Sequence, residues 1–97
     1  MAQYNISLRG LKQCLEHFDN YGCDWYENKN WQIAHGGYDL TWQLYWKDPH
    51  YGTVPVVDCV SGRYLENDCL DDDVFQRIVK VVKSVFEYSN FIIRETD

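Results

Sequence analysis

Apolar residues recur at every third or fourth position between Ser7 and Tyr21, and this spacing places them along one face of an α-helix. The recurring apolar residues are Leu8, Leu11, Leu15 and Phe18. Ser7 is a residue type that caps helix N-termini, and Gly22 is a residue type that ends helices. The pattern predicts an amphipathic helix over residues 7–21.

After this helix, apolar residues fall on alternate positions, which is the period of a β-strand with one buried face. They are Trp31 and Ile33, followed by Tyr38, Leu40, Trp42, Leu44 and Trp46. The clusters Asn28–Asn30 and Gly36–Gly37 predict turns between strands. We expect Trp42 and Leu44 to face the core from the central strand, because polar Gln43 lies between them.

Two further segments extend the predicted sheet. One is Thr53–Val60, in which Pro55 cannot donate a ladder hydrogen bond and therefore indicates an edge strand or a bulge. The other is Arg63–Glu66, which follows Ser61–Gly62, a pair typical of a tight hairpin. The short connections predict antiparallel pairing of these segments with their neighbours.

Three acids before a long apolar stripe mark the start of a second helix. Asp71, Asp72 and Asp73 lie where an N-cap and a first turn would be, and carboxylates there meet the positive end of the helix dipole. The stripe consists of Val74, Phe75, Ile78, Val79, Val81, Val82, Val85 and Phe86. The bases on the opposite face are Arg77, Lys80 and Lys83. After this helix, Phe91–Ile93 predicts either a last strand or a tail folded onto the core.

These elements predict an α+β fold in a single domain of residues 1–97. It consists of an N-terminal helix, a three- to five-stranded antiparallel β-meander, and a C-terminal helix packed on the sheet. A chain of 97 residues has room for one modest core. Since 16% of the residues are aromatic, we expect some rings at the surface, where Tyr and Trp often serve as contact residues.

The sequence predicts a cytoplasmic protein. The first ten residues lack the apolar segment of a signal peptide, and no run approaches the ~18 apolar residues that span a bilayer. Two disulfides between the four cysteines would require an oxidising compartment, of which the sequence gives no sign. We therefore expect Cys14, Cys23, Cys59 and Cys69 to be free and mostly buried thiols.

The negative charge of the chain is concentrated in one segment. Residues 48–73 contain seven acids and one base, Arg63, so this segment alone carries the net charge of −6 that the whole chain has. Such a field repels nucleic acid and attracts a basic surface. The acids from Glu66 to Asp73 do not have the alternating order of a calcium-binding loop, so solvated carboxylates are the favoured interpretation.

Catalytic and metal-binding patterns are weak. Cys14, His17 and Cys23 have zinc-ligand side chains, but a second pair with ligand spacing is missing. His35 precedes two glycines, as in an oxyanion-hole loop, and His35 or His50 is able to act as a base. No nucleophile elbow surrounds any Ser or Cys, and no phosphate-binding glycine loop occurs. We therefore expect no enzyme activity and no cofactor.

The charge and the exposed aromatic rings favour a small acidic protein that inhibits or masks a basic protein partner. Carboxylates can take the places of phosphates in the groove of a nuclease or another nucleic-acid enzyme. Immunity proteins against nuclease toxins and phage-encoded inhibitors of CRISPR effectors work in this way. The residues expected to contact the partner are Asp48, Tyr51, Asp58, Glu66, Asp68, Asp71, Asp72 and Asp73.

Two other classes stay open at this point. The first is a small enzyme or metal-binding protein that uses His35, His50 and the cysteines. The second is a structural subunit that buries its aromatic residues in a homodimer. The binding protein itself is expected to be a monomer or a homodimer, without direct contact to nucleic acid or membrane.

Overall fold

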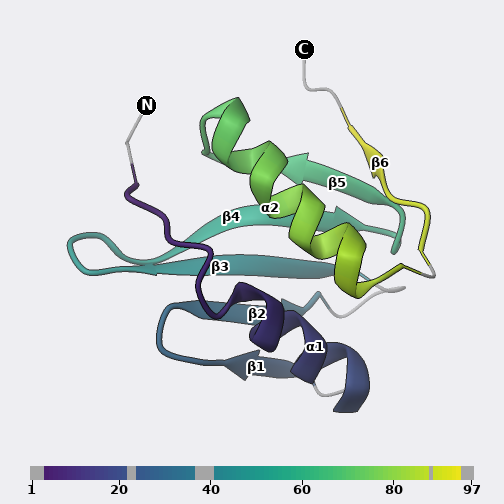
Figure 1. The fold of residues 1–97 in the computed structure, drawn as a ribbon, viewed down its shortest axis with the longest axis horizontal. Helices are drawn as coiled ribbons and strands as arrows, with labels where there is room; N and C mark the ends of the chain where they lie inside the picture. The colour runs from purple at the N-terminus through teal and green to yellow at the C-terminus, as the bar shows by residue number, and fades with distance from the viewer. Residues whose placement is uncertain (1–3, 22–23, 37–40, 88, 95–97) are drawn as a thin grey trace.

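The computed structural model describes residues 4–21, 24–36, 41–87 and 89–94, which form two helices and a six-stranded sheet (Figure 1). In chain order the elements are α1 (Leu11–Tyr21), β1 (Trp25–Glu27), β2 (Trp31–His35), β3 (Trp42–Asp48), β4 (Gly52–Val60), β5 (Tyr64–Asn67), α2 (Asp72–Val85) and β6 (Ile92–Ile93). The α+β class predicted from the sequence is therefore confirmed. Neither helix in the described part of the chain is long and apolar enough to cross a membrane.

The strands lie in the sheet in their chain order, from β1 to β6. The first five form an antiparallel meander, whereas β6 runs parallel to β5. The expectation of three to five antiparallel strands is wrong in both number and direction. The sequence did not reveal β1, because a strand of three residues is too short to show a period. For Phe91–Ile93 the last-strand alternative is confirmed by β6, but its parallel pairing with β5 was not expected.

Both helices cover the same face of the sheet (Figure 1). Helix α1 packs on β1 and β2, α2 packs on β5, and the two helices contact each other. The core between the layers contains Leu11 and Leu15 of α1, Ile78 and Val82 of α2, and Ile33 of β2, all fully buried. Among the described residues, no helix covers the opposite face of the sheet, which we call the open face.

Strand β3 shows the predicted alternation of its two faces. The exposed fractions of Trp42, Leu44 and Trp46 are 6%, 0% and 4%, so these side chains face the helices. Gln43 is exposed and Tyr45 is half-buried on the open face. The expected N-terminal part of this strand, at residues 38 and 40, lies outside the described residues.

A β-bulge in β4 lies next to Pro55, which cannot donate a ladder hydrogen bond. Leu44 lies opposite Val57 and Tyr45 lies opposite Pro55, which leaves Val56 as an extra residue in β4. Strand β4 lies inside the sheet, so the edge-strand interpretation is wrong and the bulge is confirmed. Because of the bulge, both Val56 and Val57 are buried.

The hairpin between β4 and β5 is as tight as predicted. Ser61 and Gly62 have φ angles of 57° and 64°, and Arg63 N donates to Val60 O at 3.1 Å. Two successive positive φ angles are typical of the turn that matches the twist of antiparallel strands.

Helix α1 begins four positions later than expected. Gly10 has a φ angle of 83°, which a right-handed helix cannot contain, so the helix starts at Leu11. The hydroxyl of Ser7 accepts a hydrogen bond from Arg9 N at 3.2 Å in the segment before the helix. Ser7 is therefore not the N-cap. The expected C-terminal residue, Gly22, lies outside the described residues.

Helix α2 starts where the three acids predict. Asp71 occupies the N-cap position, and Asp72 and Asp73 lie in the first turn. The side chain of Asp71 makes no capping hydrogen bond, so the expected contribution of its carboxylate as a cap is wrong. The apolar stripe is confirmed, since Phe75, Ile78, Val79 and Val82 are all buried.

Candidate protein-binding surface

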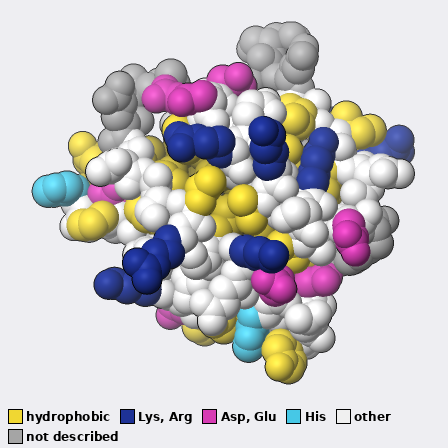
Figure 2. Space-filling model, viewed as in Figure 1, with side chains coloured by type: hydrophobic (Ala, Val, Ile, Leu, Met, Phe, Trp, Pro, Cys, Tyr) yellow, Lys and Arg dark blue, Asp and Glu magenta, His cyan; other side chains and the backbone are white. Residues whose placement is uncertain are grey.

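Both faces of the molecule carry charged side chains. Figure 2 views the helix face and shows Lys and Arg side chains spread over it, with hydrophobic side chains between them and Asp and Glu side chains around them. The bases of α2, Arg77, Lys80 and Lys83, are all exposed. Carboxylates lie on both faces, and those of the open face come from neighbouring strands of the sheet.

A row of side chains crosses the open face from β1 to β5. The strand register places Trp25 opposite Ala34, Ala34 opposite Gln43, Gln43 opposite Asp58, and Asp58 opposite Glu66. Trp25, at one end of the row, is 57% exposed. The row therefore changes from an aromatic ring on β1 to two neighbouring carboxylates on β4 and β5.

Asp68 completes a group of three acids, which we call the carboxylate cluster: Asp58, Glu66 and Asp68. Asp68 N donates to Val56 O at 3.1 Å, and this bond holds the segment after β5 beside the bulge. Asp68 is an exposed residue, but partial burial of its carboxyl group raises its pKa, and the charge of Asp58 and a hydrogen bond with Asp58 raise it further. The charge of Glu66 adds a smaller effect in the same direction.

The carboxylate cluster is only partly neutralised. Arg94 Nη1 lies 2.7 Å from Glu66 Oε1, and the hydrogen bond and charge of Glu66 raise the pKa of Arg94. Within the described ranges, no ion pair involves Asp58 or Asp68. Asp58 Oδ1 is shielded from solvent and has no hydrogen-bond partner in the described part of the chain. The cluster therefore keeps a net negative charge.

A hollow of about 300 Å³ lies beside the carboxylate cluster on the open face. Its lining includes Gly36, Thr41, Gln43, Asp58, Val60 and Glu66. Backbone and apolar groups form one part of this lining, and two carboxylates and an amide form the other. A side chain that carries a positive charge on an apolar stem matches this combination.

At the hairpin between β3 and β4, Asp48 has a structural role. Its Oδ1 accepts hydrogen bonds from His50 N at 2.8 Å and from Tyr51 N at 3.0 Å. Its Oδ2 accepts one from Trp46 Nε1 at 3.3 Å. Burial acts to raise the pKa of Asp48, but these hydrogen bonds outweigh it and the pKa is lowered. The carboxylate oxygens are thus engaged within the turn.

Tyr4 connects this hairpin with the carboxylate cluster. The ring of Tyr51, which is 64% exposed, lies 5.5 Å from the ring of Tyr4 in an edge-to-face arrangement. Tyr4 also hydrogen-bonds the thiol of Cys69, the residue after Asp68. Burial and the charge of Asp68 raise the pKa of that thiol. Tyr51 and Asp68 therefore lie toward the same end of the molecule.

The other three acids lie on the helix layer. Asp71, Asp72 and Asp73 are exposed at the N-terminus of α2, and Asp73 Oδ2 lies 4.0 Å from Arg77 Nη2. The eight residues selected from the sequence thus fall into three groups, at the hairpin, on the open face and at the start of α2. The sequence did not reveal Gln43, Tyr64 or Arg94 as neighbours of the acids, because this proximity depends on strand register.

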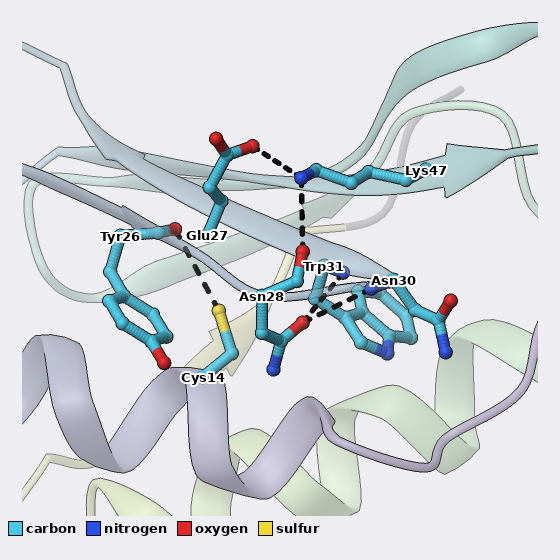
Figure 3. A network of polar contacts seen from close by, with 7 residues as sticks. All are labelled: Cys14, Tyr26, Glu27, Asn28, Asn30, Trp31 and Lys47. Carbon is cyan, nitrogen blue, oxygen red and sulfur yellow. Dashed lines mark hydrogen bonds and ion pairs between the residues drawn. The ribbon is translucent and has the colours of Figure 1, made fainter.

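The far edge of the sheet carries a neutral network of polar contacts (Figure 3). Lys47 pairs with Glu27, and Lys47 Nζ donates to Asn28 O at 3.0 Å. Asn28 Oδ1 accepts from Trp31 N at 2.9 Å and from Asn30 N at 3.3 Å. The network fixes the turn between β1 and β2 that the asparagines predicted. The charges of Lys47 and Glu27 cancel, so this pair adds no net charge to the open face.

The zinc-ligand candidates have other contacts. Cys14 is fully buried, and its Sγ faces Tyr26 O at 3.9 Å (Figure 3). The ring of His17 stacks on the ring of Tyr26 at 3.8 Å. Cys23 lies outside the described residues. In the described ranges, no three His, Cys, Asp or Glu side chains are arranged to hold a metal ion.

The two histidines considered as bases lie at opposite ends of β3. His35 pairs with Trp42, the first residue of that strand, whereas His50 belongs to the turn after its last residue. His50 contacts Tyr51, with ring centroids 6.4 Å apart. The two imidazoles therefore do not converge on one site.

No known protein family, curated protein or solved structure matches this chain. Its function therefore has to be inferred from the geometry and charge of its own residues.

Proposed function

We propose that this protein is a small cytoplasmic binding protein, without enzyme activity, that masks a basic surface of another protein. The observation that supports this proposal is the carboxylate cluster on the open face. Asp58 and Glu66 lie directly opposite each other on neighbouring strands, and like charges in this position destabilise a sheet. An unfavourable arrangement on an uncovered face is understandable when a partner supplies the compensating charge.

A nucleic-acid-handling protein is the proposed kind of partner. Its binding groove carries Lys and Arg side chains that are arranged to contact phosphates, and carboxylates can accept the same charge-assisted hydrogen bonds. Occupation of that groove inhibits the partner without any chemistry on the part of the inhibitor. Immunity proteins and phage inhibitors of CRISPR effectors are the functional classes in which this logic is found.

Affinity capture with charge variants tests the proposal. The wild-type chain, Glu66→Lys and Glu16→Lys are immobilised and exposed to an extract of the native host, and retained proteins are identified by mass spectrometry. Glu16 is the matched control because it is exposed on α1, within the helix layer. We expect a basic protein that the wild type and Glu16→Lys retain, that Glu66→Lys loses, and that salt releases.

Retention that does not depend on charge would contradict the proposal. If the same proteins are retained by all three chains and resist elution by about 0.5 M salt, where the Debye length is only a few ångströms, charge does not drive the association. The proposal of a masked basic surface would then be wrong.

A further inference from the structure

We infer that the open face recognises an arginine side chain of the partner, which enters the hollow beside Asp58 and Glu66. This inference rests on the proposed function and deepens it, because it names the surface and the chemical group that it binds. The carboxylate cluster and the basic partner are complementary in charge. Three further observations favour a guanidinium in particular.

The first observation is that the cluster already holds a guanidinium of the chain itself. Arg94 Nη1 lies 2.7 Å from Glu66 Oε1, and Arg94 Cζ lies 5.2 Å from the centroid of the Tyr64 ring. Arg63 Cζ lies 5.7 Å from the same ring. A carboxylate beside an aromatic ring is a combination that suits Arg, which pairs with one and stacks on the other. The open face therefore has the groups that bind arginine.

The second observation is the state of Asp58. Its Oδ1 is shielded from solvent and receives no hydrogen bond within the described residues. A carboxylate oxygen that is removed from water without a donor is unfavourable, and a positive charge placed in the adjoining hollow offsets part of this penalty. A guanidinium carries five N–H donors in one plane, and Asp58, Gln43 and Glu66 all line the hollow that it would enter.

The third observation comes from the other acidic groups. The oxygens of Asp48 already accept three hydrogen bonds from its own turn. Asp71, Asp72 and Asp73 are exposed at the N-terminus of α2, where water solvates them and the helix dipole favours them. A bound cation gains the most electrostatic free energy at the carboxylate cluster, because the acids there are partly buried and repel one another. The same burial and repulsion raise the pKa of Asp68.

Titration with short peptides, followed by amide chemical shifts, tests the inference on the full chain. The probe is acetyl-Gly-Arg-Gly-amide at low ionic strength, and the controls are the same peptides with lysine or citrulline in place of arginine. We expect saturable shifts centred on Gln43, Asp58 and Glu66. Arginine should bind severalfold more tightly than lysine, and citrulline should give no saturable shift because it has no charge.

Two variants sharpen the test. Asp58→Asn keeps the shape of the side chain and should weaken arginine binding at least tenfold. Arg94→Gln removes the internal guanidinium from Glu66 and should strengthen arginine binding severalfold. The same spectra report whether each variant is folded. If Asp58→Asn does not fold, Asp68→Asn serves in its place, because Asp68 is exposed and lies outside the strands.

Several outcomes would overturn the inference. They are equal shifts with arginine and citrulline, shifts centred on the N-terminus of α2 or on the hairpin at Tyr51, or an unchanged affinity in Asp58→Asn. The proposed function survives each of them if Glu66→Lys still abolishes capture of a basic protein. If both experiments fail, the acidic surface is not a binding site for a basic partner.

Discussion

Asp68 illustrates how a single residue reflects the repulsion within the carboxylate cluster. Burial and the neighbouring Asp58 raise its pKa in the folded protein, so the folded state holds its proton more tightly than the unfolded chain does. The stability that this proton confers is fully present below the unfolded pKa of about 4 and is lost as the pH rises through the folded pKa. At neutral pH the ionised carboxylate therefore destabilises the protein.

The variant Asp68→Asn is expected to be more stable than the wild type at pH 7. The gain in the free energy of unfolding should be small, roughly 0.2–1 kcal/mol, because Asp68 is exposed and solvent screens its charge. Urea unfolding at pH 7 and pH 3 measures it, and the gain should disappear at pH 3, where both side chains are neutral. A loss of stability at pH 7 would show that Asp68 is favourably paired.

The cysteines should differ widely in reactivity. Cys14 and Cys59 are 0% and 1% exposed, and burial raises the pKa of Cys59 to about 12. Cys69 is half-buried. In a Cys23→Ser background, a thiol reagent at pH 7 should label only Cys69 in the native protein and all three thiols after denaturation, since the thiolate is the reactive form. Fast native labelling of Cys14 or Cys59 would contradict their burial.

Strand β3 has one face toward the helices and one toward solvent. Its Leu44 is fully buried between the sheet and the helices, whereas neighbouring Gln43 is exposed on the open face. Leu44→Ala should lower the free energy of unfolding by about 2–5 kcal/mol through loss of burial and formation of a cavity. Gln43→Ala, the matched control in the same strand, should change it by less than about 0.5 kcal/mol. A larger loss of stability in Gln43→Ala than in Leu44→Ala, measured by urea unfolding, would show that the faces are reversed.

The sequence predicted those elements whose burial or turn geometry is determined by residues close together in the chain. The alternation in β3, the stripe of α2 and the Ser61–Gly62 turn are examples, because burial and turn geometry depend there on neighbouring residues. Other features depend on distant contacts. The positive φ of Gly10 delays α1, and β6 forms only because β5 offers it an edge.

The candidate surface likewise combines features that neighbouring residues determine with features that depend on distant contacts. The concentration of acids in residues 48–73 was evident from the sequence. That Asp58 faces Glu66, and that Arg94 pairs with Glu66, follows from register and topology. Hydrogen bonds assign Asp48 to the hairpin turn instead, which a count of charges along the chain cannot show.

For the molecule as a whole, the central feature is the position of the carboxylate cluster on the uncovered face of the sheet. Exposed bases of α2 lie on the helix face, and the carboxylate cluster lies on the uncovered side of the sheet. Under the proposed function, the uncovered face meets the basic partner and the bases of α2 lie on the other side of the molecule, while Arg94 stays beside Glu66. Electrostatic attraction should then speed the encounter, and added salt should slow it.

Displacement of nucleic acid from the captured partner tests the masking of its basic surface most directly. The purified partner is bound to fluorescently labelled DNA or RNA, and the protein is added while fluorescence anisotropy reports the bound fraction. We predict that the wild type and Glu16→Lys release the nucleic acid near equimolar concentration, whereas Glu66→Lys leaves it bound. Simultaneous binding of the protein and the nucleic acid to the partner would contradict the account.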